Sequence, residues 1–122
     1  MSALPVLSQD ESALVARAEA TGPLLRDAGE AIDEARQLPA FVLEALHEAG
    51  CFRMSLPLAE GGLAASIPAQ VRTVEAVASA NGSAGWCVMI GSANNQLLNF
   101  AESEVVKEIS RSPRTVLAAA FF

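Results

Sequence analysis

The side chain best suited to acid–base chemistry is the only histidine of the chain, His47. It lies three residues after Glu44 and directly before Glu48. A histidine base needs an orienting partner and a substrate pocket, and no nucleophile lies near it in the sequence. The residues alone therefore favour a surface or interhelical position for His47, and they assign no catalytic residue.

Metal and phosphate chemistry have weaker support. Glu30, Asp33 and Glu34 lie close together, but a metal site would need histidine or a denser set of oxygen ligands. The stretch EGGL has neither the spacing nor the lysine of a phosphate-binding loop. We interpret the three carboxylates as a solvated helix face and predict no metal site.

A third candidate is GSAGWCVMIGSANNQLL, residues 82–98, where polar side chains interrupt an apolar run. On a helix with about 100° between residues, the apolar side chains form one narrow stripe. That stripe comprises Trp86, Ile90, Ala93, Leu97 and Phe100. Ser92, Asn95 and Asn99 gather nearly opposite, and Asn94 lies between the two faces.

Two interpretations of residues 82–98 stay open at this point. In the first, the stripe is core and the amides bond to neighbouring backbone or to other chains. In the second, a polar side chain reaches a ligand cavity at a helix or domain boundary. The residues by themselves favour the first interpretation.

Composition limits which binding partners and which cell compartment are expected. The chain has 122 residues, 52% of them hydrophobic, which suffices for the core of one domain. Its net charge of −6 argues against nucleic acid or an anionic membrane as the main partner. Cys51 and Cys87 match no metal or redox spacing, and the N-terminus lacks a basic signal-peptide region. These features predict buried thiols in a cytoplasmic protein.

The pattern predicts about five helices that must position these side chains. Ser8 and Glu11 have the spacing of a capping box, so a helix should begin there and run to about Arg36, interrupted at Gly22-Pro23. Four more helices are expected over about 39–49, 67–80, 82–98 and 103–110. Their expected core-facing residues include Leu14, Ala18, Leu25, Ala28, Ile32, Val42, Ala45, Leu46, Ala49, Ile67, Val71, Val74 and Ala78.

The last residues, RTVLAAAFF, predict a strand over 114–122. An unpaired apolar strand edge promotes aggregation, so a natural domain seldom ends on one. We therefore expect these residues to be the front part of a longer polypeptide.

Two stretches resemble a known family. LPAFVLEALHEAGCFRMSLPLAEGG and VEAVASANGSAGWCVMIGS resemble successive motifs at the front of acyl-CoA dehydrogenase-like flavoproteins. The Gly-Ser-Ala-Gly-Trp form is most similar to the branch that contains two-component flavin-dependent monooxygenases, such as the p-hydroxyphenylacetate hydroxylase oxygenase. The resemblance runs from about Glu11 to Phe122.

The resemblance implies an all-α, orthogonal N-terminal helical bundle over residues 1–113. Residues 114–122 would be the first strand of a middle β domain, and a C-terminal four-helix bundle would follow. FMN or FAD would lie between the later two domains, bound mainly by residues absent from this chain. The N-terminal domain would help to cover the flavin and a small-molecule substrate.

The resemblance also implies an activity, with monooxygenase slightly favoured over acyl-CoA dehydrogenase. A separate flavin reductase would be a partner protein. The protein itself would form a homodimer or homotetramer. The 122-residue chain alone would be inactive. The alternative is a non-catalytic helical interaction module that keeps the domain without a flavin.

Two site residues follow from the resemblance. Trp86 matches the family tryptophan that lies near the flavin and substrate, which implies a cofactor-binding role. Asn94 stands eight residues later, where several hydroxylases of the branch have a substrate-contacting histidine. An amide can donate and accept hydrogen bonds but cannot serve as a base near neutral pH. The expected role of Asn94 is therefore to orient substrate.

Overall fold

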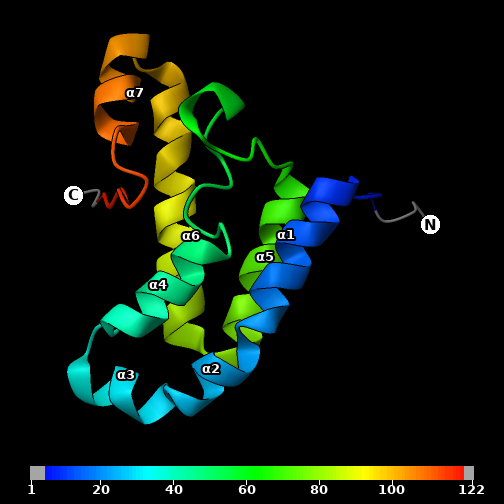
Figure 1. Cartoon of the computed structure of the whole chain (residues 1–122), viewed down its shortest axis with the longest axis vertical. Helices are drawn as coiled ribbons and strands as arrows, with labels where there is room; N and C mark the ends of the chain where they lie inside the picture. Colours follow the sequence, from blue (N-terminus) through cyan, green and yellow to red (C-terminus); the bar gives the residue numbers. More distant parts are fainter. Residues whose placement is uncertain (1–4, 120–122) are drawn as a thin grey trace.

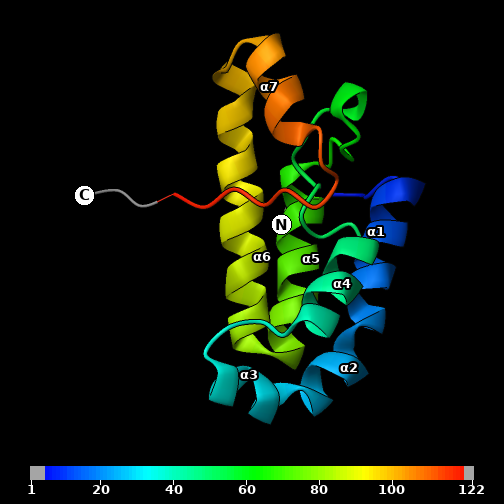
Figure 2. The same cartoon turned by 60° about the vertical axis from the view of Figure 1, so that its left-hand side comes forward.

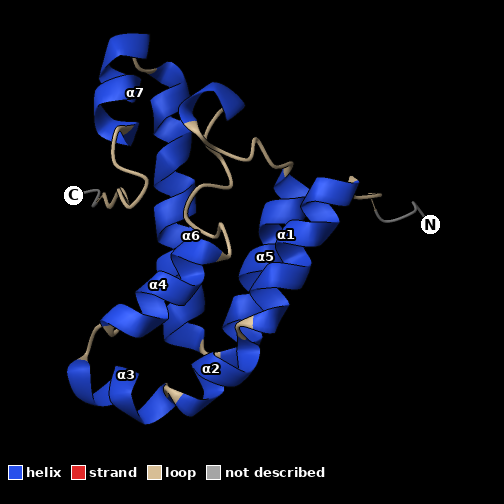
Figure 3. Cartoon of the chain, in the orientation of Figure 1, coloured by secondary structure: helices blue, strands red, loops and turns tan. Residues whose placement is uncertain are grey.

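Helices build the architecture of residues 5–119, which this computed structural model describes (Figure 1). Figure 3 shows helices joined by loops, with no strand in that range. The elements are α1 (Gln9–Ala20), α2 (Gly22–Asp27), α3 (Gly29–Ala35), α4 (Ala40–Glu48), η1 (Leu58–Glu60), α5 (Ile67–Ala80), α6 (Gly82–Asn95), η2 (Gln96–Phe100) and α7 (Ser103–Ser110). The all-α prediction is confirmed.

The first predicted helix is divided into α1, α2 and α3. The break at Gly22-Pro23 was expected, and Thr21 closes α1 by donating its hydroxyl to the Ala18 carbonyl at 2.6 Å. A second break at Ala28, between α2 and α3, was not expected. The two bends carry α2 and α3 across one end of the longer helices (Figure 2).

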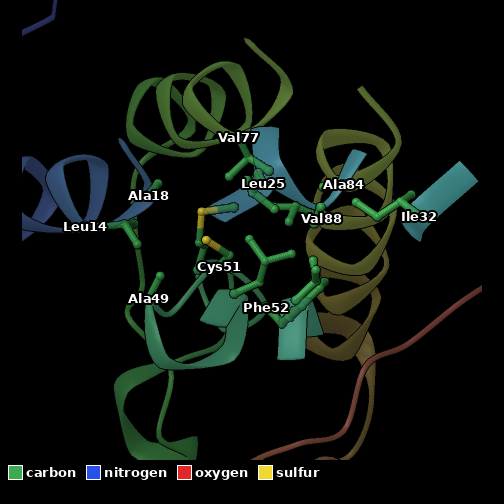
Figure 4. Packing of buried hydrophobic residues seen from close by; sticks show 14 residues of the cluster. Leu14, Ala18, Leu25, Ile32, Ala49, Cys51, Phe52, Val77, Ala84 and Val88 are labelled. Carbon is green, nitrogen blue, oxygen red and sulfur yellow. The ribbon is translucent and has the colours of Figure 1, made fainter. Parts of the chain in front are cut away.

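The core lies where α1, α5 and α6 meet the shorter helices. Helix α5 contacts α1 on one side and α6 on the other. Leu14, Ala18, Leu25 and Ile32 point into one cluster, as the first helical pattern predicted (Figure 4). The cluster also contains Ala28, Val42, Leu46, Ala49, Cys51, Phe52, Met54, Val77, Ala84 and Val88.

The expected inward stripe of α5 is correct for Val74, which packs against the core, and wrong for Ile67 and Val71. Ile67 and Val71 are each 58% exposed, whereas Ala69, Thr73 and Val77 are buried. The hydroxyl of Thr73 donates to the Ala69 carbonyl at 2.8 Å, which satisfies this polar group inside the core.

The expected inward stripe of α6 is wrong as well. Trp86 is 64% exposed, Leu97 51% and Phe100 90%. Small residues face inward instead, and a Cβ added to Gly85 would lie only 2.4 Å from the Cβ of Ala78 on α5. The close approach leaves no room for a side chain at Gly85, while Val88 on α6 and Val77 on α5 reach the core.

Hydrogen bonds from Arg53 hold the connection between α4 and α5 in place. Arg53 donates from Nε to the Gly61 carbonyl at 2.9 Å and from Nη2 to the Glu60 carbonyl at 2.7 Å. A smaller core of Leu56, Leu98 and Val106 packs α7 against this connection.

The strand predicted at 114–122 is not formed over residues 114–119, which belong to no helix or strand. Residues 120–122 lie outside the described range. A strand is defined by hydrogen bonds to a neighbouring strand, and residues 5–119 contain none. The middle β domain therefore remains a prediction. Across the same range, no helix is both long and apolar enough to cross a membrane.

Glu11 ties the start of α1 to the start of α5. Its carboxylate accepts hydrogen bonds from the backbone N–H of Ser8 at 3.0 Å and of Ser66 at 2.7 Å. These bonds, that of Ser8 first, lower the pKa of Glu11 from its ordinary 4.5 to about 2. The expected capping box is present, with Ser8 Oγ accepting from the Glu11 N–H.

We predict that replacing Gly85 by alanine destabilises the fold by about 1–3 kcal/mol, because the new methyl group would meet Ala78. Gly82→Ala is the matched control in the same helix, since open space surrounds Gly82. It should leave stability unchanged or raise it by up to about 1 kcal/mol. Urea unfolding of both variants measures the difference, and equal midpoints would show that the seam tolerates a side chain.

A second prediction concerns acid unfolding. Because the pKa of Glu11 is lower in the folded chain, its contribution to stability is present at neutral pH and is lost as pH falls from about 4.5 to about 2. Glu11→Gln should lower the melting temperature at pH 7 and match wild type near pH 2. Glu19→Gln, exposed on the same helix, is the control. A difference that persists unchanged at pH 2 would contradict this role.

Candidate functional site

Trp86 stands between two adjoining hollows, which we call the Trp86 trough. Their volumes are about 490 and 610 Å³, within the range of small-molecule sites. The two hollows share part of their lining, namely Arg36, Gln37, Leu38, Trp86 and Cys87. The trough therefore runs along α6 beside the segment that joins α3 to α4.

Local sequence explains why Trp86 faces outward. The side chain of Asn81 accepts a hydrogen bond from the Ala84 N–H at 2.9 Å, which starts α6 at Gly82. Ala84 and Val88 then turn into the core, so Trp86 is directed away from it. A largely exposed indole on a rigid helix is available to a planar ligand.

The larger hollow of the trough has a cationic lining. Its charged side chains are Arg36 and Arg114, with His47 beside them and no carboxylate in the lining. Arg114 also forms an ion pair with Glu44, about half of each side chain being exposed. In a chain of net charge −6, this local positive character favours an anionic or electron-rich ligand group.

His47 forms part of the same wall. Its ring packs on Phe52 with centroids 4.8 Å apart and planes tilted by 48°. Burial, and then the charge of Arg114, lower the pKa of His47, so the ring is neutral at pH 7 and can both donate and accept. The position between helix and loop matches the interhelical interpretation, and the ring also lines the trough.

The buried polar side chains of α6 clamp the loop that follows α4. Asn95 Nδ2 donates to the Phe52 carbonyl at 2.8 Å, and Ser92 Oγ donates to the Cys51 carbonyl at 2.9 Å. Ser55 Oγ returns a bond to the Ser92 carbonyl at 2.6 Å. These contacts confirm that Ser92 and Asn95 bond to neighbouring backbone.

Asn94 lies apart from Trp86, under the segment that follows α7. It is 8% exposed, and its Nδ2 donates to the Leu117 carbonyl at 3.4 Å. Gly91, one turn earlier, permits this crossing, since a Cβ there would lie 2.9 Å from Val116 and 3.0 Å from Phe52. Trp86 lines the trough and Asn94 does not, so the two predicted site residues do not share one hollow.

Sequence reasoning missed the cationic lining. Arg36 and Arg114 are 78 positions apart, and nothing in their spacing connects them. Arg36 ends α3 with a φ of 54°, the left-handed conformation that turns the chain toward α4. Only the folded chain brings these side chains together with His47.

The thiols are poor nucleophiles. Burial raises the pKa of Cys51 to about 12 and also raises the pKa of Cys87, so both are protonated near neutral pH. Cys51 is buried as expected, and Cys87 is half-buried in the wall of the trough. Within residues 5–119 no three His, Cys, Asp or Glu side chains come close enough to hold a metal ion.

Comparison with known proteins identifies related sequences. The model of the acyl-CoA dehydrogenase N-terminal domain family matches residues 11–111. Indole-3-acetate monooxygenase from Pseudomonas putida is 30% identical over 90 residues, which cover 74% of this chain and 23% of that protein. The match thus spans less than a quarter of the length of this relative. No solved structure matches the chain significantly.

We predict that Asn95→Ala destabilises the fold by about 1–3 kcal/mol, because the buried Phe52 carbonyl would lose its donor. Asn94→Ala is the matched comparison on the same helix. Its longer bond to Leu117 should be worth no more than about 1 kcal/mol. Urea unfolding separates the two, and a larger loss for Asn94→Ala would contradict the proposed clamp.

Proposed function

Because the chain belongs to the acyl-CoA dehydrogenase N-terminal domain family, we propose that it is the N-terminal part of a flavin-dependent oxidoreductase. Its role is to help cover the flavin and the substrate, while the 122-residue chain by itself is inactive. The observation that supports this most is the Trp86 trough, where a largely exposed indole lies beside a cationic, otherwise apolar hollow.

Monooxygenase activity is favoured slightly over acyl-CoA dehydrogenase activity. The support is the similarity to a protein named indole-3-acetate monooxygenase. The family name alone would favour the dehydrogenase. In either case the substrate is a small molecule, and the monooxygenase would receive reduced flavin from a separate reductase.

The described residues fit one wall of a flavin site rather than a complete site. The exposed ring of Trp86 can pack against a planar ring system, and Arg36 can face a negatively charged group. When bound, FMN or FAD would supply the redox chemistry. Leu38 and Ile90 give this wall apolar side chains, which would exclude water from a closed site and so protect reactive species from hydrolysis.

Asn94 has a proposed role in orienting substrate. Its bond to the Leu117 carbonyl is long, so the amide can exchange this partner for a substrate group. It can hold a proton donor or acceptor in place but cannot remove a proton.

The proposed enzyme is a homodimer or homotetramer and acts in the cytoplasm. The competing function is a non-catalytic interaction module that keeps this domain without flavin. Neither proposal assigns a catalytic residue to residues 5–119, because the catalytic groups of the enzyme would lie elsewhere in the polypeptide.

We predict that the intact polypeptide encoded with this chain binds flavin, with absorbance near ~450 nm. Trp86→Ala should weaken flavin binding about three- to tenfold, the value of one aromatic contact, and leave the melting temperature unchanged because the ring is exposed. Asn94→Ala should raise the KM for substrate about two- to tenfold without affecting flavin affinity. Fluorescence titration with FMN and FAD, followed by steady-state kinetics, measures both effects.

Phe41→Ala is the control, since Phe41 is 54% exposed on α4 and lies outside the trough. It should change neither flavin affinity nor KM. A folded intact protein that binds neither FMN nor FAD would favour the interaction module instead.

A further inference from the structure

Arg114 reaches the larger hollow of the Trp86 trough from the segment that follows α7, and it is already paired there. Its partner is Glu44 on α4, and about half of each side chain is exposed. Glu44 is not part of the lining of this hollow, whereas Leu43 before it and His47 one turn later are. The ion pair therefore joins a guanidinium that lines the hollow to a carboxylate at its rim.

The charges around the larger hollow do not balance. Arg36 and Arg114 carry two positive charges, and among residues 5–119 Glu44 is the one carboxylate that forms an ion pair with either of them. His47 adds no charge at pH 7, because burial and then Arg114 lower its pKa. One positive charge is left without a partner, which suits a ligand with a single negative charge.

The two hollows of the trough differ in how they would receive an anion. Asp33 lies in the lining of the smaller hollow together with Arg36, while the lining of the larger hollow has no carboxylate. A negative group is therefore repelled from the smaller hollow and attracted to the larger one. Beside it, Leu38, Ile90 and the indole of Trp86 offer apolar surface to a planar ring.

The pair between Glu44 and Arg114 is of a kind that a ligand can replace. An ion pair with both partners half exposed contributes little to stability, because water competes for each of them. Arginine binds a carboxylate through two parallel N–H donors, whether that carboxylate belongs to the protein or to a ligand. Inside the hollow the same interaction would be less screened by water than at the rim.

We propose that Glu44 is an internal competitor for Arg114, and that an aromatic monocarboxylate binds in the larger hollow by taking this guanidinium from Glu44. Glu44 thereby sets the affinity of the trough for anions although it lies outside the lining. The inference rests on the proposed function in taking the Trp86 trough as a ligand site. It adds the charge class of the ligand and a residue that tunes its affinity.

Isothermal titration calorimetry of the intact polypeptide, without flavin, tests the exchange. The probes are cinnamate and cinnamamide, which have the same planar frame and differ by one negative charge. Cinnamate should bind about tenfold more tightly, because it forms charge-assisted bonds to arginine. Arg114→Gln should remove most of this preference and leave the affinity for cinnamamide unchanged. Arg111→Gln, three residues earlier and outside the lining, should leave both affinities unchanged.

Glu44→Gln provides the deciding measurement. It should tighten the binding of cinnamate about three- to tenfold, because Arg114 no longer has a competing partner, and leave cinnamamide unchanged. Glu48→Gln is the matched control, since it removes the same charge from an exposed position of α4 outside the lining. In a protein that already carries Arg114→Gln, Glu44→Gln should have no further effect, because the two side chains act as a pair.

Three results would overturn the proposal. The first is equal binding of the two probes, or no binding of cinnamate. The second is an equal gain from Glu48→Gln, which would identify a general effect of charge. The third is unchanged or weaker binding of cinnamate by Glu44→Gln, which would show that Glu44 does not compete for Arg114.

Flavin binding is measured separately on the same protein, by its absorbance. A protein that shows the exchange but binds neither FMN nor FAD would overturn only the proposed enzyme. One that binds flavin and does not prefer cinnamate to cinnamamide would overturn only the role of Glu44.

Discussion

The close approach of α5 and α6 is the constraint on which the rest of the structure depends. Gly85 lies against Ala78 with no space for a methyl group between them. Only small side chains fit at this crossing, whereas Val77 and Val88, elsewhere on the same two helices, reach the core. Trp86, the residue after Gly85, lies away from this crossing and is largely exposed.

The same seam explains why polar residues are buried. With small residues facing α5, the flank of α6 is left to pack on the loop after α4, whose backbone carbonyls need donors. Ser92 and Asn95 provide them. The clamp holds Cys51 and Phe52 in the core, and Phe52 in turn supports the ring of His47 at the trough. Packing and the candidate site therefore share residues.

Two hollows on the surface differ in the chemistry of their linings. The larger hollow of the Trp86 trough has Arg36 and Arg114 beside the exposed indole, while a smaller hollow between α5 and α6 has no ionisable side chain in its lining. Ile90 of α6 lines the trough, and Ala93, one turn later, lines the hollow between α5 and α6.

The sequence by itself determined where most of the helices begin, because capping side chains and prolines act within a few residues; the break at Ala28 and the end of α6 at Asn95 were not predicted. Ser8 with Glu11, and Ser66 before α5, are examples. The family was also readable from two local motifs, and residues 11–111 match its model. Only the tertiary structure decided which faces of α5 and α6 turn inward. It also decided that Arg36 and Arg114 line the same hollow. Apolar periodicity identifies a stripe of side chains, but it does not say whether that stripe packs inside this chain or against another surface. Where two helices cross at small residues, their close approach decides which face turns inward.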